Sequence, residues 1–218
     1  MVSIDKPLEP VVVAQIPLSG ARASALQFRY LFVTDAEGLK TIDVTDPKQP
    51  RLVAGNTIAL RDAHRVYLAR TYAYVAAGAD GVVIVDIERP EAMREYQRFT
   101  ANGAIVDARD VIVATTNASL FAYVADGKGG LKVLQLTSPE SQPKFYGFSP
   151  EPKPQLIASY RTGKPALSLS KGLDRDRGVD ETGGQMAVFG RRGSRPLNLQ
   201  EMRELFLDDS GKPWYVTD

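Results

Sequence analysis

The stretch YAYVAAGADGVVIVDIERP, residues 72–90, decides the fold. It combines two short runs of Tyr, Val and Ile with a turn between them that contains Gly78 and Gly81. Runs of β-branched and aromatic residues that a Gly-rich turn separates are typical of a β-hairpin. Residues 30–47, YLFVTDAEGLKTIDVTDP, and residues 120–139, LFAYVADGKGGLKVLQLTSP, repeat the pattern. The chain therefore contains several copies of one β unit.

Four copies of the unit align on a turn glycine, at Gly38, Gly81, Gly130 and Gly184. In the first three copies a proline follows nine positions after that glycine. A fourth strand follows each of these prolines, and a further strand begins upstream of each hairpin at an alanine. The alanines are Ala21, Ala63, Ala108 and Ala166. Four strands per unit with no helix between them predict the blades of a β-propeller.

We therefore predict an all-β fold, a β-propeller of four-stranded antiparallel blades, with about four blades in this chain. The blades lie near residues 20–60, 61–102, 103–162 and 163–193, and residues 194–218 form a short C-terminal helix and a tail. The first strand of each blade is the innermost, where small residues such as Ala suit the crowded axis. Residues 1–218 form one domain, either a propeller in itself or the C-terminal part of a longer one.

The quoted repeats resemble the LVIVD repeat, a bacterial and archaeal β-propeller motif. The resemblance extends from Ala21 to about Thr162 and is specific in residues 72–90 and 121–136. Gln135 departs from it, because the motif has there the aspartate found here as Asp43 and Asp86. The resemblance implies a propeller fold and a scaffold role more than a reaction. It also implies an exported or surface location, although the residues leave the compartment open and the chain starts without a signal peptide.

The pattern changes at both ends of the chain. Blade four keeps GGQMAVFG, residues 183–190, but the charged segment DRDRGVDE, residues 174–181, stands in place of its second strand. Apolar residues at helical spacing in residues 198–209 predict the short helix, and residues 138–154 predict an extended loop. Alternating apolar residues in 11–18 predict a strand before the first blade. We expect this strand to complete blade four beside residues 186–189, within one chain or across a dimer.

Composition excludes several classes of function. The chain has 27 Lys and Arg residues against 26 Asp and Glu residues, which gives no electrostatic reason to bind nucleic acid. It has no cysteine, which excludes disulfides and thiolate metal sites. No apolar run is long enough for a membrane span. The sequence indicates no cofactor, no nucleic-acid partner and no membrane span.

Basic side chains recur at the start of the predicted inner strands. Arg22, His64 and Arg109 each follow an inner-strand alanine, and Leu167 holds that position in the fourth copy. In a propeller these side chains would form a basic collar near the channel mouth, suited to an anion or a carboxylate. The candidate ligand-binding residues are Arg22, Asp62, His64, Arg65, Asp107, Arg109 and Asp110. The alternative, which we favour, is that the basic side chains are solvated and form ion pairs with the three aspartates.

No catalytic residue is predicted. His64 is the only histidine, which excludes a site of several histidines within one chain, and no serine lies in a nucleophile motif. Asp174, Asp176 and Asp180 suggest a calcium alternative, but their spacing does not fit an EF-hand and neighbouring arginines compete for the carboxylates. A loop with internal ion pairs explains these residues better, and we predict no metal site.

We predict a non-enzymatic repeat protein that acts as a binding or assembly scaffold. Unpaired blade edges would recruit a protein partner or a second copy. One alternative is an accessory subunit or domain of an exported enzyme or electron-transfer complex. Another is a sugar-binding or hydrolytic propeller that uses carboxylates such as Asp62 and Asp107.

Overall fold

The structure, a computed structural model of the full chain, describes residues 1–116, 119–138 and 149–170. It also describes positions 187–188, 191–192, 195–196, 200 and 210. The chain divides into two compact units, Met1–Leu169 and Ser170–Asp218. The first unit holds nearly all of the described residues, and it carries three copies of the predicted blade.

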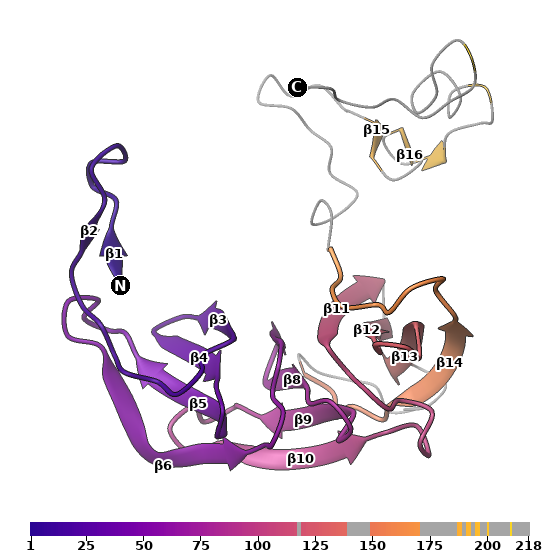
Figure 1. Ribbon diagram of the computed structural model, residues 1–218, viewed down its shortest axis with the longest axis horizontal. Helices are drawn as coiled ribbons and strands as arrows, with labels where there is room; N and C mark the ends of the chain where they lie inside the picture. Colours follow the sequence, from indigo (N-terminus) through magenta and orange to yellow (C-terminus); the bar gives the residue numbers. More distant parts are fainter. Residues whose placement is uncertain are drawn as a thin grey trace. The chain divides into compact units, whose positions relative to one another are not determined.

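Three four-stranded antiparallel sheets make up these blades, and in each sheet the strand order follows the chain (Figure 1). Blade 1 consists of β3 (Ala23–Gln27), β4 (Tyr30–Thr34), β5 (Gly38–Asp43) and β6 (Arg51–Ala59). Blade 2 consists of β7 (Val66–Ala69), β8 (Tyr72–Ala76), β9 (Val82–Asp86) and β10 (Arg94–Phe99). Blade 3 consists of β11 (Asp110–Thr116), β12 (Ser119–Ala125), β13 (Leu131–Thr137) and β14 (Gln155–Tyr160). The predicted fold class, an all-β propeller of four-stranded antiparallel blades, is confirmed.

The glycine that aligns the repeats lies where the fourth strand passes close to the turn. Gly38, Gly81 and Gly130 all have a positive φ. A side chain at any of the three positions would collide with a backbone carbonyl oxygen of the fourth strand in the same blade. These oxygens belong to Ile58, Phe99 and Tyr160. Because only glycine tolerates both the conformation and the close approach, it recurs at this position.

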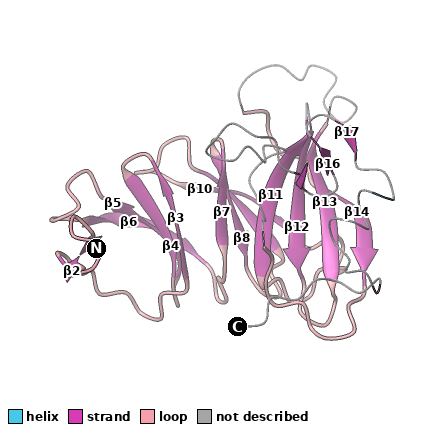
Figure 2. Cartoon of the chain, turned by 90° about the horizontal axis from the view of Figure 1, so that it is seen from above, coloured by secondary structure: helices cyan, strands magenta, loops and turns pink. Residues whose placement is uncertain are grey.

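The hydrophobic core lies between the sheets. Tyr30 and Phe32 of blade 1 pack against alanines and valines on one side of blade 2. Tyr72 and Tyr74, on the other side of blade 2, pack in the same way against blade 3. In Figure 2, β7 and β8 accordingly lie between the strands of blade 1 and those of blade 3. Burying a side chain such as Val, Leu or Phe contributes about 1.5–3 kcal/mol, so these two interfaces hold the unit together.

The first strands of neighbouring blades contact each other, as expected of innermost strands: β3 contacts β7, and β7 contacts β11. Ala63 and Ala108 lie just before β7 and β11, and both are fully buried. Ala21 is exposed and Ala166 is partly exposed. The crowding predicted for all four alanines therefore occurs at Ala63 and Ala108.

Shorter sheets lie towards the ends of the chain. β1 (Val2–Ser3) pairs with β2 (Val11–Val12), and in the second unit β15 (Ala187–Val188), β16 (Arg191–Arg192) and β17 (Arg195–Pro196) form a three-stranded sheet. The prediction that residues 11–18 form one strand is wrong beyond Val12, since Ile16 and Leu18 pack against blade 1 instead.

Several predictions for the C-terminal part fall largely outside the described residues. Gln200 is helical, but the rest of the predicted helix lies outside them. So do most of predicted blade four, including Met186 and Phe189, and residues 139–148 of the predicted loop. The remaining loop residues, 149–154, contain no strand or helix, in agreement with the prediction.

Candidate functional site

The segment that leads into a blade lies against the turn between the second and third strands of the same blade. Asp62, before blade 2, lies over Gly78, and Asp107, before blade 3, lies over Gly127. A Cβ atom at Gly78 would come within 2.6 Å of Asp62 Oδ2, so the turn needs glycine there. The backbone of Gly78 also exchanges hydrogen bonds with that of Ala108, at 3.0 and 2.9 Å. These contacts fix the polar side chains at the start of each blade.

Five of the predicted ligand-binding residues form a continuous polar row across the three blades. Arg22 Nη1 donates a hydrogen bond of 2.7 Å to Asp62 Oδ1. Asp62 Oδ2 lies 3.0 Å from His64 Nε2, and that nitrogen lies 3.1 Å from Arg109 Nη1. Arg109 Nε in turn lies 2.6 Å from Asp107 Oδ1. We call Arg22, Asp62, His64, Arg109 and Asp107 the polar row.

The other two candidates, Arg65 and Asp110, form a separate ion pair, with 3.8 Å between Nε and Oδ1. Asp110 is buried, and its carboxylate accepts hydrogen bonds from the backbone N–H groups of Val111 and Leu169 at 2.8 and 2.9 Å. Leu167, which holds the equivalent position in the fourth copy, is exposed. Asp110 therefore fastens the segment after blade 3 to the start of β11.

The ion pairs within the polar row balance its charges. Burial raises the pKa of Asp62, but the hydrogen bonds from Arg22 and His64 outweigh burial and hold that pKa below its usual value. Of the aspartates expected to pair with Arg22, His64 and Arg109, Asp62 and Asp107 do so, whereas Asp110 pairs with Arg65 instead. An anionic ligand would have to compete with these carboxylates for the guanidinium groups. Ligand binding at the collar stays a prediction.

Two buried ion pairs, which were not predicted from the sequence, each join an aspartate in the turn after the second strand to a lysine on the third strand of the same blade. In blade 1, Lys40 Nζ lies 2.7 Å from Oδ2 of the fully buried Asp35. In blade 3, Lys132 Nζ lies 3.8 Å from Oδ2 of the fully buried Asp126. The corresponding residues of blade 2 are Ala77 and Val83. The signal was available in the sequence, because a lysine two positions after the turn glycine occurs only where the turn starts with aspartate.

A second candidate surface is an apolar side of blade 1. Leu26, Leu31, Ile42 and Leu52 are register partners, so one apolar row crosses all four strands. We call the side of the sheet that carries this row the outer face of blade 1. Ile42 is buried, whereas Leu26 is 63% and Leu52 is 42% exposed.

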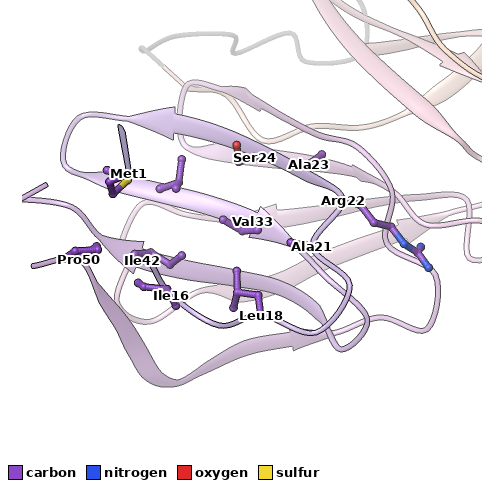
Figure 3. Close-up of a pocket in the computed structure, with 11 residues that line it drawn as sticks. Met1, Ile16, Leu18, Ala21, Arg22, Ala23, Ser24, Val33, Ile42 and Pro50 are labelled. Atoms are coloured by element: carbon purple, nitrogen blue, oxygen red, sulfur yellow. The ribbon is translucent and has the colours of Figure 1, made fainter. Parts of the chain in front are cut away.

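A groove of about 380 Å³ lies on the outer face of blade 1. Figure 3 shows Ile16 and Leu18, from the segment before blade 1, beside Ile42. Arg22 also lines the groove, and its side chain points away from the apolar residues in Figure 3. Arg22 therefore belongs both to the groove and to the polar row.

The corresponding rows of blades 2 and 3 are covered. In blade 2 the row contributes to the core shared with blade 1 through Leu68, Ala73 and Val85. In blade 3 it contributes to the core shared with blade 2 through Val113, Ala122, Leu134 and Leu156. In both cases the preceding blade supplies the cover. On blade 1 the described residues that lie at this face are Met1, Pro50 and the short segment with Ile16 and Leu18, and they leave a groove between them.

Two further properties can be stated for the part of the chain that the structure describes. It contains no group of three or more His, Cys, Asp or Glu side chains placed to hold a metal ion. It also contains no helix with the length and hydropathy that a membrane span requires. The calcium alternative, Asp174, Asp176 and Asp180, lies outside these residues.

Comparison with protein families bears on blades 2 and 3. The model of the LVIVD repeat matches residues 60–101 and 107–147. These two segments are LVIVD repeats. They cover blade 2 and the first three strands of blade 3, the blades whose repeats were the most specific in the sequence, so the resemblance is confirmed over this part of the chain. Blade 1 has the same strand order and the same turn glycine as the two LVIVD repeats.

Two solved structures are distantly similar to the chain. One is the crystal structure of the computationally designed Ika4 protein, with 14% sequence identity over 70% of this chain and 79% of that chain and a TM-score of 0.43. The other is a chain in a Saccharomyces cerevisiae complex of Dbp5, Nup159 and Gle1, with 9% identity over 55% of this chain and 28% of that chain and a TM-score of 0.33. We base no conclusion on either similarity. A search of curated proteins finds no significant match.

Proposed function

We propose that this LVIVD-repeat protein is a non-enzymatic binding and assembly module, and that it binds a protein partner through the outer face of blade 1. The observation that supports this proposal is the apolar row across blade 1. In the equivalent rows of blades 2 and 3 the members on the first three strands pack in a core shared with the preceding blade, whereas on blade 1 the first-strand member, Leu26, is exposed, as is Leu52, beside a groove.

The energetics favour an occupied groove. Fully burying a leucine side chain contributes about 1.5–3 kcal/mol, and the exposed parts of Leu26 and Leu52 together amount to about one such side chain, so a partner could gain about 1.5–3 kcal/mol there. Contiguous apolar surface with a polar rim is typical of protein interaction sites. Arg22 and Ser24 supply polar groups among the residues that line the groove.

The partner would use a face of the module rather than only its strand edges. In both described blade interfaces, aromatic side chains of one sheet pack on small and branched side chains of the next. The outer face of blade 1 carries branched apolar side chains of the same kind, namely Leu31, Val33 and Ile42. A flat apolar surface that presents aromatic side chains is therefore the expected shape of the partner.

Site-specific photo-cross-linking tests this proposal. A benzoylphenylalanine placed at Leu26, in cells that express the full chain, should yield a cross-linked species of discrete mass upon illumination. The matched control is the same amino acid at Leu8, which is 97% exposed in the loop between β1 and β2. Absence of a discrete species at Leu26, or the same species at both positions, would contradict the proposal.

A further inference from the structure

One nitrogen of His64 has two neighbours that require opposite protonation states. Asp62 Oδ2 lies 3.0 Å and Arg109 Nη1 lies 3.1 Å from His64 Nε2. A ring nitrogen of histidine either carries a proton and donates it, or carries a lone pair and accepts a hydrogen bond. An ionised carboxylate only accepts, and a guanidinium group only donates. His64 Nε2 can therefore form a hydrogen bond with only one of these two neighbours at a time.

The two neighbours belong to different blades. Asp62 lies with His64 in the segment that leads into blade 2, whereas Arg109 lies just before blade 3. A neutral imidazole with its proton on Nδ1 accepts a hydrogen bond from Arg109 at Nε2 and so joins the two blades. A protonated imidazole donates from Nε2 to Asp62 instead, and its positive charge repels the guanidinium group of Arg109.

The backbone on both sides of this contact is fixed. The N–H group of His64 donates to the Ala76 carbonyl at 2.8 Å, and the His64 carbonyl accepts a hydrogen bond of 2.6 Å from the Thr34 hydroxyl. The N–H group of Arg109 donates to the Ala125 carbonyl at 2.8 Å. A change of partner at His64 Nε2 is therefore confined to the side chains.

The other charges of the polar row cancel one another. Among the described residues, Asp62 and Arg109 face the imidazole of His64 directly. Behind them, Arg22 pairs with Asp62, and Asp107 pairs with Arg109. These two carboxylates balance the two guanidinium groups, so a proton on His64 adds a positive charge that no carboxylate of the row compensates.

The surroundings of His64 let a proton enter and add no further net charge. The side chain is 18% exposed, so its imidazole can exchange a proton with water. Arg65 and Asp110, which follow His64 and Arg109 in sequence, pair with each other. The protonation of His64 is thus the change that decides the charge of the row.

We propose that His64 is a proton-controlled switch between blades 2 and 3. Neutral His64 holds Arg109 through Nε2. Uptake of a proton at Nε2 moves the hydrogen bond to Asp62, and Arg109 then keeps only Asp107. Histidine is the side chain that changes its charge between about pH 5 and 8, so mild acidification operates the switch. The shared core still joins the two blades, and the inference is independent of the partner proposed for the groove.

NMR spectroscopy of the purified full chain, without a histidine tag, tests the proposal. His64 is the only histidine, so the imidazole signals need no further assignment. The nitrogen-15 shifts of a neutral imidazole show which nitrogen carries the proton. On the alkaline side of its titration, His64 should carry the proton on Nδ1 and a lone pair on Nε2. A neutral form with the proton on Nε2 overturns the proposal.

Substitution of the two neighbours should move the imidazole titration in opposite directions. Arg109→Gln removes the cation that opposes protonation and should raise the midpoint, whereas Asp62→Asn removes the favourable anion and should lower it. Each shift should be roughly 0.2–0.7 pH units, as expected for a partly exposed charge pair. Arg98→Gln is the matched control, because Arg98 is similarly exposed but pairs with Asp80 and Glu95. Shifts of the same sign, or no shift in either variant, contradict the proposal.

A double-mutant cycle shows whether Arg109 is released. His64→Ala and Arg109→Gln, alone and combined, are unfolded with denaturant on the alkaline and on the acidic side of the imidazole titration. Their coupling should change the unfolding equilibrium constant by up to about 5-fold on the alkaline side and should vanish on the acidic side. The cycle of His64→Ala with Asp62→Asn should behave in the opposite way. A coupling between His64 and Arg109 that is the same on both sides overturns the proposal.

Discussion

Lys40 Nζ lies 2.7 Å from Asp35 Oδ2 within blade 1, and both side chains are buried. The same pair occurs in blade 3 as Lys132 and Asp126, whereas blade 2 has Val83 and Ala77 in their place. The protein thus contains, in equivalent sheets, a buried ion pair and its apolar replacement. Buried ion pairs can often be replaced by apolar residues at little cost, but removal of one partner leaves a charge without compensation.

The first prediction concerns this replacement in blade 1. Lys40→Val leaves the Asp35 carboxylate buried without its cation and should lower the free energy of unfolding by about 3–5 kcal/mol. Asp35→Ala should cost less, because Lys40 still has Glu37 at 2.9 Å. The double variant Asp35→Ala/Lys40→Val should be more stable than Lys40→Val alone. Denaturant unfolding of the three variants measures these differences, and a double variant less stable than both single variants would contradict the reasoning.

The second prediction is the pH dependence of the same pair. Burial raises the pKa of Asp35, but the hydrogen bonds from Lys40 and from the backbone of Glu37 and Gly38 hold it below its usual value. A carboxyl group with a lowered pKa in the folded state stabilises the protein above its unfolded pKa, which is about 4, and this stability is lost as the pH falls. Unfolding free energies measured from neutral pH into the acid range should therefore fall more steeply for the wild type than for Asp35→Ala/Lys40→Val. Parallel curves would show that Asp35 does not contribute.

The third prediction separates backbone conformation from close approach at the turn glycines. Gly81 and Gly55 both have a positive φ, near 70°. A Cβ atom at Gly81 would collide with the Phe99 carbonyl, whereas a Cβ atom at Gly55 has no atom within 4 Å. Gly81→Ala should therefore be less stable than Gly55→Ala by about 1–3 kcal/mol. Thermal unfolding of the two variants measures the difference, and equal midpoints would mean that the fourth strand can move away from the turn.

The fourth prediction concerns the alanines before the inner strands. Ala108 is fully buried and Ala21 is exposed. Ala108→Leu should overpack the space beside β11 and cost about 1–3 kcal/mol, and Ala63→Leu should behave alike. Ala21→Leu serves as the control and should change the unfolding midpoint little. If all three variants unfolded at the wild-type temperature, the inner position of these segments would be wrong.

The fifth prediction concerns the polar row. Arg22 and Asp62 are linked by a hydrogen bond of 2.7 Å, but both side chains remain partly exposed. Their coupling energy in a double-mutant cycle with Arg22→Gln and Asp62→Asn should be about 0.2–1 kcal/mol, and it should decrease at high salt. A coupling that is several times larger and independent of salt would indicate that the row is far less hydrated than its exposure suggests.

The strands and the polar row could be predicted from the sequence because both depend on a repeated local pattern. The turn glycine, and the β-branched and aromatic segments on either side of it, allowed the strands of each blade to be aligned with those of the others. That alignment placed Arg22, His64 and Arg109 at equivalent positions, and the structure joins His64 to Arg109 directly. Spacing along the chain was enough for these features, since β-strands put equivalent residues of equivalent blades at the same level.

The features that could not be predicted depend on what packs against a surface. The apolar pattern of Leu31 and Ile42 is the same as that of their buried equivalents, so the pattern does not reveal that a groove remains beside them. The predicted strand at residues 11–18 was wrong for a related reason. Its alternating pattern is interrupted by Pro17, and Ile16 and Leu18 gain more by covering blade 1 than by extending β2.

The buried ion pair of blade 1 differs from the polar row in one respect that matters for the history of the gene. Asp35 and Lys40 lie in the same blade, so duplication of the DNA that encodes one blade copies the acid together with its base. The contact between His64 and Arg109 joins two blades, and a copied blade inserted between them would separate the pair. Additional blades with an internal pair can thus arise in one genetic step without compensating changes in their neighbours. Blades joined through the polar row depend on the order in which they follow one another.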